Sequence, residues 1–133
     1  FGDSGDNDIG SIIYNNTGNS MTFITNAANA LVIDSSGNGT FTGNVTAYSD
    51  ERLKSDIKTI DNALDKVSQM RGVSFTKDDK KGSGVIAQEL EKIAPELVTD
   101  GEYKSVAYGN IVGYLIEAIK ELKAEVKELK ESK

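Results

Sequence analysis

Residues 110–133, NIVGYLIEAIKELKAEVKELKESK, have the strongest helical pattern in the sequence. Apolar residues recur every three or four positions and can be written as the a and d positions of a heptad repeat. The a positions are Val112, Ile119 and Val126, and the d positions are Leu115, Leu122 and Leu129. At about 1.5 Å per residue the helix would be roughly 36 Å long. We expect so long a helix to pack against copies of itself. Branched residues at a with Leu at d favour a coiled coil of two helices. The alternative is an amphipathic helix that covers its own domain.

Upstream of this helix, residues 49–109 mix charged and apolar side chains. Apolar residues recur at helical spacing from Ile57 to Met70, which predicts a helix, with Asp61 or Thr59 as its N-cap. Gly72 would end that helix.

The rest of this region predicts shorter elements. We expect a strand over 73–75, a polar loop over 77–84, a short helix over 88–93 that Pro95 stops, and a strand over 103–108. The polar loop is either an arm that reaches back onto the preceding segment or an ordinary solvent loop.

Residues 1–48 differ sharply in composition. They contain no Lys or Arg and are rich in Gly, Asn, Ser and Thr, so that all 15 basic residues of the chain lie beyond them. Short apolar or alternating runs between turn residues predict strands over 12–14, 21–25, 31–33 and 40–46. The apolar content is too low for these strands to close a core alone. We therefore expect them to bury their side chains against neighbouring copies, and the alternative is a flexible linker.

The overall composition excludes several classes of function. The 133 residues contain no Cys and no His, which excludes disulfides, thiolate zinc sites and histidine bases. A net charge of −6 argues against non-specific nucleic-acid binding. No apolar run could span a bilayer, and residues 1–3 are unlike a signal peptide, so we expect a piece of a longer protein. Residues 6–10, DNDIG, lack the ligand spacing of a calcium loop and predict a plain turn.

Without His or Cys, the nucleophilic chemistry left to the chain is that of Ser with Lys. A lysine can act as the base when burial lowers its pKa from about 10.4 toward neutrality. One such pair, Ser49 and Lys54, lies at the change of composition, within residues 49–57, SDERLKSDI.

This run resembles the start of a known family. Residues 49–57 are similar to the opening of the C-terminal intramolecular chaperone of phage tail spikes and tail fibres, the endosialidase-type autoprotease (peptidase family S74). The resemblance continues through residues 84–89, GVIAQE, residues 95–98, PELV, and residues 115–122, LIEAIKEL. Residues 1–48 resemble, more weakly, the repetitive fibre shaft that precedes this domain.

The resemblance implies a function and its site residues. In this family the chaperone assembles as a trimer, guides folding of the fibre before it and then cuts itself off. Ser49 would be the nucleophile and Lys54 the general base, and the cut would fall between Tyr48 and Ser49. No cofactor or metal is implied. The partners would be two further copies and the preceding shaft of the same polypeptide, with no nucleic acid and no membrane. The shaft would belong to the virion, and the chaperone would act in the host cytoplasm during assembly.

The spacing of Ser49 and Lys54 adds a constraint of its own. A separation of five residues does not place two side chains on one face of a helix, nor on one face of a strand. The segment must therefore bend, or Lys54 must come from a neighbouring subunit, and we expect the geometry to form only in the assembled trimer. In the alternative reading, Ser49 is a helix cap ahead of two acids and Lys54 is a solvated charge.

Together these patterns predict a homotrimeric α+β protein. Residues 1–48 would be a β-rich distal fibre-shaft segment, and residues 49–133 a mixed α/β chaperone and autoprotease domain that ends in a long coiled-coil-like helix. The alternative function is a permanent trimerisation tip that never cleaves.

Overall fold

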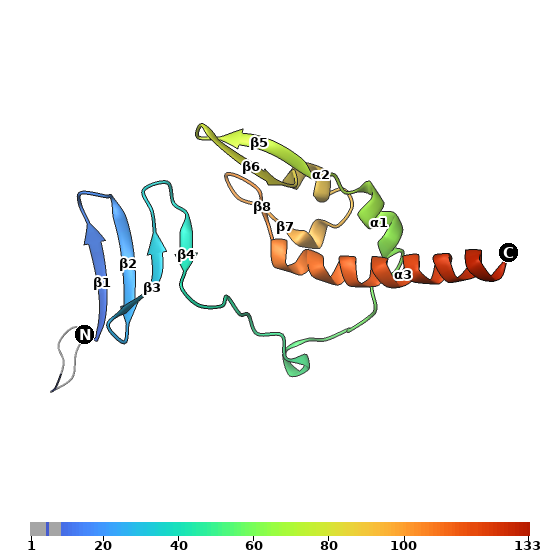
Figure 1. Ribbon diagram of the computed structural model, residues 1–133, viewed down its shortest axis with the longest axis horizontal. Helices are drawn as coiled ribbons and strands as arrows, with labels where there is room; N and C mark the ends of the chain where they lie inside the picture. The colour runs from blue at the N-terminus through green and yellow to red at the C-terminus, as the bar shows by residue number, and fades with distance from the viewer. Residues whose placement is uncertain (1–4, 6–8) are drawn as a thin grey trace. The chain divides into compact units, whose positions relative to one another are not determined.

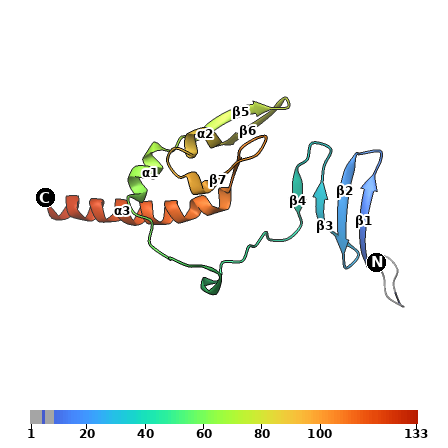
Figure 2. The same ribbon diagram turned by 180° about the vertical axis from the view of Figure 1, so that it is seen from behind.

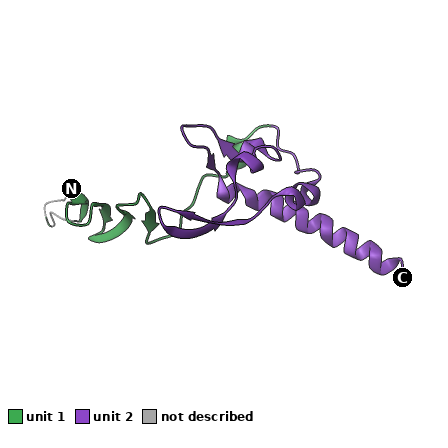
Figure 3. Ribbon diagram, turned by 90° about the horizontal axis from the view of Figure 1, so that it is seen from above, with its two compact units in different colours: residues 1–55 green, residues 56–133 purple. Residues whose placement is uncertain are grey.

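The computed structural model describes residue 5 and residues 9–133. The chain divides into two compact units, Phe1–Ser55 and Asp56–Lys133, shown in different colours in Figure 3. The predicted α+β class is confirmed: the units contain separate antiparallel sheets and a long C-terminal helix.

The first unit contains a four-stranded antiparallel meander (Figure 1). Its strands are β1 (Gly10–Asn15), β2 (Ser20–Thr25), β3 (Ala28–Ile33) and β4 (Gly39–Phe41). The turn between β2 and β3 consists of Asn26 and Ala27, both with positive φ, at 52° and 57°, as a two-residue hairpin turn requires. The four predicted strands are confirmed, but the last ends at Phe41 instead of residue 46 because the chain bends at residues 42–43 and leaves the sheet.

One face of this sheet is apolar. The strand register aligns Ile12, Phe23, Leu31 and Phe41 in one row across the strands, and Tyr14, Met21 and Ile33 in the next. Residues two apart on a strand share a face, so both rows lie on the same side. Every one of these side chains is exposed or only partly buried within the chain. The strands β1 to β4 carry no Lys, Arg, Asp or Glu.

The second unit builds its own core from short elements. In chain order they are α1 (Ala63–Gln69), β5 (Val73–Lys77), β6 (Lys80–Gly84), α2 (Ala87–Leu90), the 3-10 helix η2 (Pro95–Leu97), β7 (Val98–Thr99), β8 (Ser105–Val106), the 3-10 helix η3 (Tyr108–Asn110) and α3 (Ile111–Glu131). Leu90, Ala94, Leu97 and Tyr114 form the buried cluster. Figures 1 and 2 both show α1 lying against α3, in agreement with the close packing of these two helices.

The predicted helix over residues 57–70 is shorter than expected. It begins at Ala63 because Asn62 adopts a left-handed conformation with φ of 53°. Neither Asp61 nor Thr59 is its N-cap. Instead, the carboxylate of Glu121, on α3, accepts hydrogen bonds from the backbone N–H groups of Ala63 and Leu64, at 2.9 and 2.8 Å.

The predicted polar loop over residues 77–84 is wrong. These residues complete the hairpin of β5 and β6, and the turn consists of Asp78 and Asp79, with φ of 51° and 59°. Aspartate tolerates the left-handed conformation that this turn needs.

Two further predictions need adjustment. The short helix α2 ends at Leu90 instead of residue 93 and continues as a turn towards Pro95. The strand expected over 103–108 reduces to β8, which pairs only with the equally short β7.

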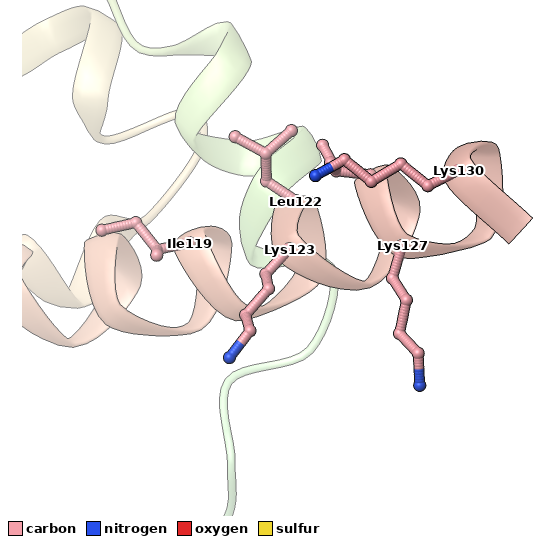
Figure 4. Close-up of a pocket in the computed structure, with 6 residues that line it drawn as sticks. Ile119, Leu122, Lys123, Lys127 and Lys130 are labelled. Carbon is pink, nitrogen blue, oxygen red and sulfur yellow. The ribbon is translucent and has the colours of Figure 1, made fainter.

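The C-terminal helix is confirmed, but the two sides of α3 differ. Tyr114 and Ala118 are buried against the unit. The heptad positions are not: between 41% and 65% of each of the six a and d residues is exposed. The helix therefore covers its own domain with one face. The six a and d residues, which we call the heptad stripe, stay largely exposed among the described residues. Figure 4 shows part of this stripe, where Ile119 and Leu122 lie in an open groove flanked by Lys123, Lys127 and Lys130.

Candidate functional site

Ser49 and Lys54 lie on either side of a single 3-10 turn, η1 (Glu51–Leu53). Asp50 precedes the turn in an extended conformation, and its side chain accepts a hydrogen bond from the backbone N–H of Arg52 at 2.9 Å. Asp50 is therefore the N-cap of the turn, a position that short acidic side chains favour. The reading in which Ser49 is the cap is wrong.

The turn brings the two candidate catalytic side chains together. Lys54 returns to an extended conformation after the turn, with φ of −124° and ψ of 148°. Its Nζ lies 2.7 Å from the Oγ of Ser49 and 3.2 Å from the carbonyl oxygen of the same residue. The spacing allowed Ser49 and Lys54 to meet either through a bend in the segment or between subunits, and the structure contains the bend. The contact lies within one chain and needs no neighbouring subunit, contrary to the expectation that it forms only in a trimer.

The pair is open to solvent in the single chain. Tyr48 is 97% exposed, and both Ser49 and Lys54 are also exposed. As an ammonium, Lys54 donates to the Ser49 hydroxyl. A neutral amine at the same distance could accept the hydroxyl proton, which is the arrangement that a general base requires.

Asp50 holds a second interaction next to this pair. The Arg52 side chain donates from Nε to both carboxylate oxygens, at 3.0 and 3.1 Å, and from Nη2 at 2.6 Å. These hydrogen bonds from Arg52 lower the pKa of Asp50, so the carboxylate is ionised at neutral pH. The pattern of Ser and Lys does not indicate this role of Asp50. An Asp in the N-cap position followed by Glu51 is the signal that could have revealed it.

Tyr114 also has a shifted pKa, but it lies in the core of the second unit and not at the candidate site. Burial, with a smaller effect of its hydrogen bond to Glu96, raises the pKa of Tyr114 to about 12. Lys66 Nζ lies 5.6 Å from the centre of the same ring, within the range of a cation–π contact. Tyr114 belongs to the core cluster, so these contacts anchor α3 to its unit.

The described residues offer no other chemistry that the sequence suggested. They contain no group of three or more His, Cys, Asp or Glu side chains arranged to hold a metal ion. Most of the acidic run at residues 6–10 lies outside the described residues, so its predicted turn is not assessed. Within the described part, no helix combines the length and the apolar character needed to cross a membrane.

The Ser49–Lys54 turn stands at the start of a segment with known relatives. Residues 49–99 match the Peptidase S74 family model, whose description is chaperone of endosialidase. This segment is therefore similar to the chaperone-of-endosialidase family. The match begins at Ser49, so the similar segment opens on the candidate nucleophile and includes the whole turn.

The chain is also similar to long tail fibre proteins. Long tail fiber protein Gp37 of Enterobacteria phage K3 is 41% identical over 99 residues, which cover 65% of this chain and 8% of that protein. The Gp37 of Enterobacteria phage T2 is 41% identical over 99 residues, or 65% of this chain and 7% of that protein. The Gp37 of Enterobacteria phage Ox2 is 37% identical over 110 residues, or 72% of this chain and 43% of that protein. The chain therefore spans less than half of each of these three proteins.

Proposed function

We propose that residues 49–133 are a self-cleaving chaperone of a phage tail fibre. Three copies associate, align the shaft segments of residues 1–48 during folding, and then cut the Tyr48–Ser49 bond. The family match and the similarity to long tail fibre proteins support the chaperone role. The observation that carries the cleavage step is the 2.7 Å separation of Lys54 Nζ and Ser49 Oγ. The mature shaft would then be part of the virion, and the chaperone would act in the host cytoplasm.

The cleavage chemistry follows from the positions of these atoms. Neutral Lys54 takes the hydroxyl proton as Ser49 Oγ attacks the carbonyl carbon of Tyr48. The C–N bond of the Tyr48–Ser49 peptide breaks, and Lys54 returns its proton to the departing amine of Ser49. Tyr48 is then held as an ester on Ser49. Water hydrolyses the ester to leave the Tyr48 carboxylate and the free Ser49 hydroxyl, so the chain cuts itself once.

Association would control the timing of the cut. A lysine amine in water is protonated at neutral pH, and burial favours its neutral form. In the single chain Lys54 is exposed. Neighbouring copies that cover this 3-10 turn would exclude water from it. The Ser49–Lys54 contact, which already exists in the single chain, would then become able to react. Cleavage would thus report correct assembly, and removal of the chaperone would leave the fibre kinetically trapped.

Two uncovered apolar surfaces support association of identical copies. The heptad stripe of α3 is exposed along its length. Glu125 and Lys130 occupy g and e positions, where they can pair between parallel helices. The apolar face of the sheet carries no charge, so identical sheets can meet there without like-charge repulsion. Joining the C-terminal ends would raise the effective concentration of the sheets and fix their register.

Denaturing electrophoresis of single-residue variants tests the cleavage step. We expect the purified wild-type chain to separate into two fragments, and Ser49→Ala and Lys54→Ala to stay whole. Ser55→Ala and Lys58→Ala are matched controls, because they remove an exposed serine and an exposed lysine from the same stretch. A wild-type chain that remains whole after assembly would support the alternative, a permanent trimerisation tip.

A further inference from the structure

The turn that joins Ser49 to Lys54 is held by contacts inside itself. Residues 42–49 and 51–55 are all exposed, so packing within the first unit does not fix their conformation. Two backbone hydrogen bonds close the turn, from Leu53 to Asp50 at 3.2 Å and from Lys54 to Glu51 at 3.0 Å. Bonds of this kind are weak when water can compete for both partners.

Apart from the hydrogen bonds of Lys54 with Ser49, the other contacts described for the turn converge on one carboxylate. Asp50 accepts the Arg52 backbone N–H as an N-cap and also accepts the Arg52 side chain through Nε and Nη2. We call this set of contacts the Asp50–Arg52 clamp. The clamp ties Asp50, which follows the nucleophile, to Arg52 in the middle of the turn. It therefore favours the bent conformation over the extended conformations that a solvent-exposed segment can also adopt.

We propose that Asp50 and Arg52 are positioning residues for the self-cleavage reaction. The proposal rests on the proposed function of Ser49 and Lys54. Neither residue touches the Tyr48–Ser49 bond through a contact in the structure. The clamp acts by raising the fraction of time that Lys54 Nζ spends within hydrogen-bonding distance of Ser49 Oγ.

The clamp also engages a carboxylate whose charge interacts with that of Lys54. A carboxylate free to swing towards Lys54 would compete with the Ser49 hydroxyl for the amine. In the structure both Asp50 oxygens accept hydrogen bonds from Arg52, and Lys54 Nζ donates to Ser49 instead. The fork of the guanidinium can hold both oxygens together, which a lysine at the same position cannot do.

The rate of self-cleavage in the full chain tests the proposal. We expect Asp50→Ala to slow fragment appearance by about ten- to a hundredfold, the range expected when a reacting group is misplaced. Asp50→Asn keeps the N-cap and should restore much of the rate. Arg52→Ala should slow the cut, and Arg52→Lys should rescue it only in part. Glu51→Ala is the matched control, because it removes an exposed acid from the same turn.

The outcomes separate this proposal from the one on which it rests. Light scattering should show the same oligomeric state for every variant, so that a slow cut is not a failure to assemble. If Ser49→Ala and Lys54→Ala stay whole while Asp50→Ala and Arg52→Ala cut at the wild-type rate, the clamp is overturned and the proposed function stands. If Glu51→Ala slows the cut as much as Asp50→Ala, the clamp is also overturned. If the wild type does not cut at all, both proposals are overturned.

Discussion

The sheet of residues 10–41 and the unit of residues 56–133 both carry many apolar side chains, but only the second buries them. All the buried hydrophobic residues among those described lie in the second unit, where Leu90, Ala94 and Leu97 are no more than 3% exposed. In the sheet, Ile12, Tyr14 and Phe41 remain more than half exposed. The difference indicates that the second unit can fold from its own sequence, whereas the sheet needs further surface to cover its apolar face.

This asymmetry suits a chaperone joined to its client. A unit that folds alone can present the heptad stripe of α3 before the sheet has found its partners. The sheet would then fold among copies that are already aligned.

The largest effect should come from a charge in the heptad stripe. Leu122→Asp places a carboxylate where we expect helices of different copies to meet, and a buried unpaired charge is strongly unfavourable. We expect association and cleavage to be lost while the circular dichroism of the second unit is retained. Ala124→Asp, on an exposed position outside the stripe, is the control. Analytical ultracentrifugation that finds both variants equally associated would show that the stripe is not an interface.

A core substitution should distinguish the two units in stability. Leu90→Ala removes a side chain that is 2% exposed and should lower the free energy of unfolding of the second unit by about 2–5 kcal/mol. Leu31→Ala in the sheet should cost much less in the unassociated chain, since its side chain is only partly buried there. Urea titrations in a Ser49→Ala, Leu122→Asp background, which we expect to be both uncleaved and unassociated, measure both. Equal losses would mean that the sheet has a core of its own.

A smaller effect should appear as a pH dependence in the second unit. Hydrogen bonds from the backbone N–H groups of Leu64 and Ala63 lower the pKa of Glu121 below its usual value of 4.5. The stabilisation that Glu121 provides is therefore present above pH 4.5 and is lost as the pH falls through the lowered value in the folded state. We expect Glu121→Gln to reduce the fall of the melting temperature on acidification.

Glu125→Gln is the matched control for that measurement. Glu125 is an exposed carboxylate on the same helix. Identical melting profiles of the two variants from neutral pH to well below pH 4.5, where the loss is expected, would show that Glu121 does not cap α1.

The sequence predicted most of the elements but not the contacts between distant residues. The heptad pattern was enough to locate α3, and the short alternating runs were enough to locate β1 to β4. The helix predicted over residues 57–70 is too long because Asn62 adopts a left-handed conformation. The first N–H groups of the actual helix donate to Glu121, 57 to 58 residues away, which no local pattern reveals. The β5–β6 hairpin was missed because its turn uses two aspartates instead of Asn-Gly and its second strand is mostly Lys and Gly.

At the candidate site, too, the sequence predicted which residues matter but not the contacts that arrange them. Ser49 and Lys54 were identified from their resemblance to a family, since Ser and Lys are too common for composition to single them out. The spacing correctly required a bend or a second chain, but it could not choose between them. In the structure the bend contains the N-cap at Asp50 and its contacts with Arg52, which are local but carry no periodic pattern.

The most direct test of the central claim is to trap the ester between Tyr48 and Ser49. Hydroxylamine added to the assembling wild-type chain should intercept it, and mass spectrometry should find a fragment that ends in a Tyr48 hydroxamate beside one that begins with a free Ser49. A cut at another bond, or fragments from Ser49→Ala under the same conditions, would contradict the account.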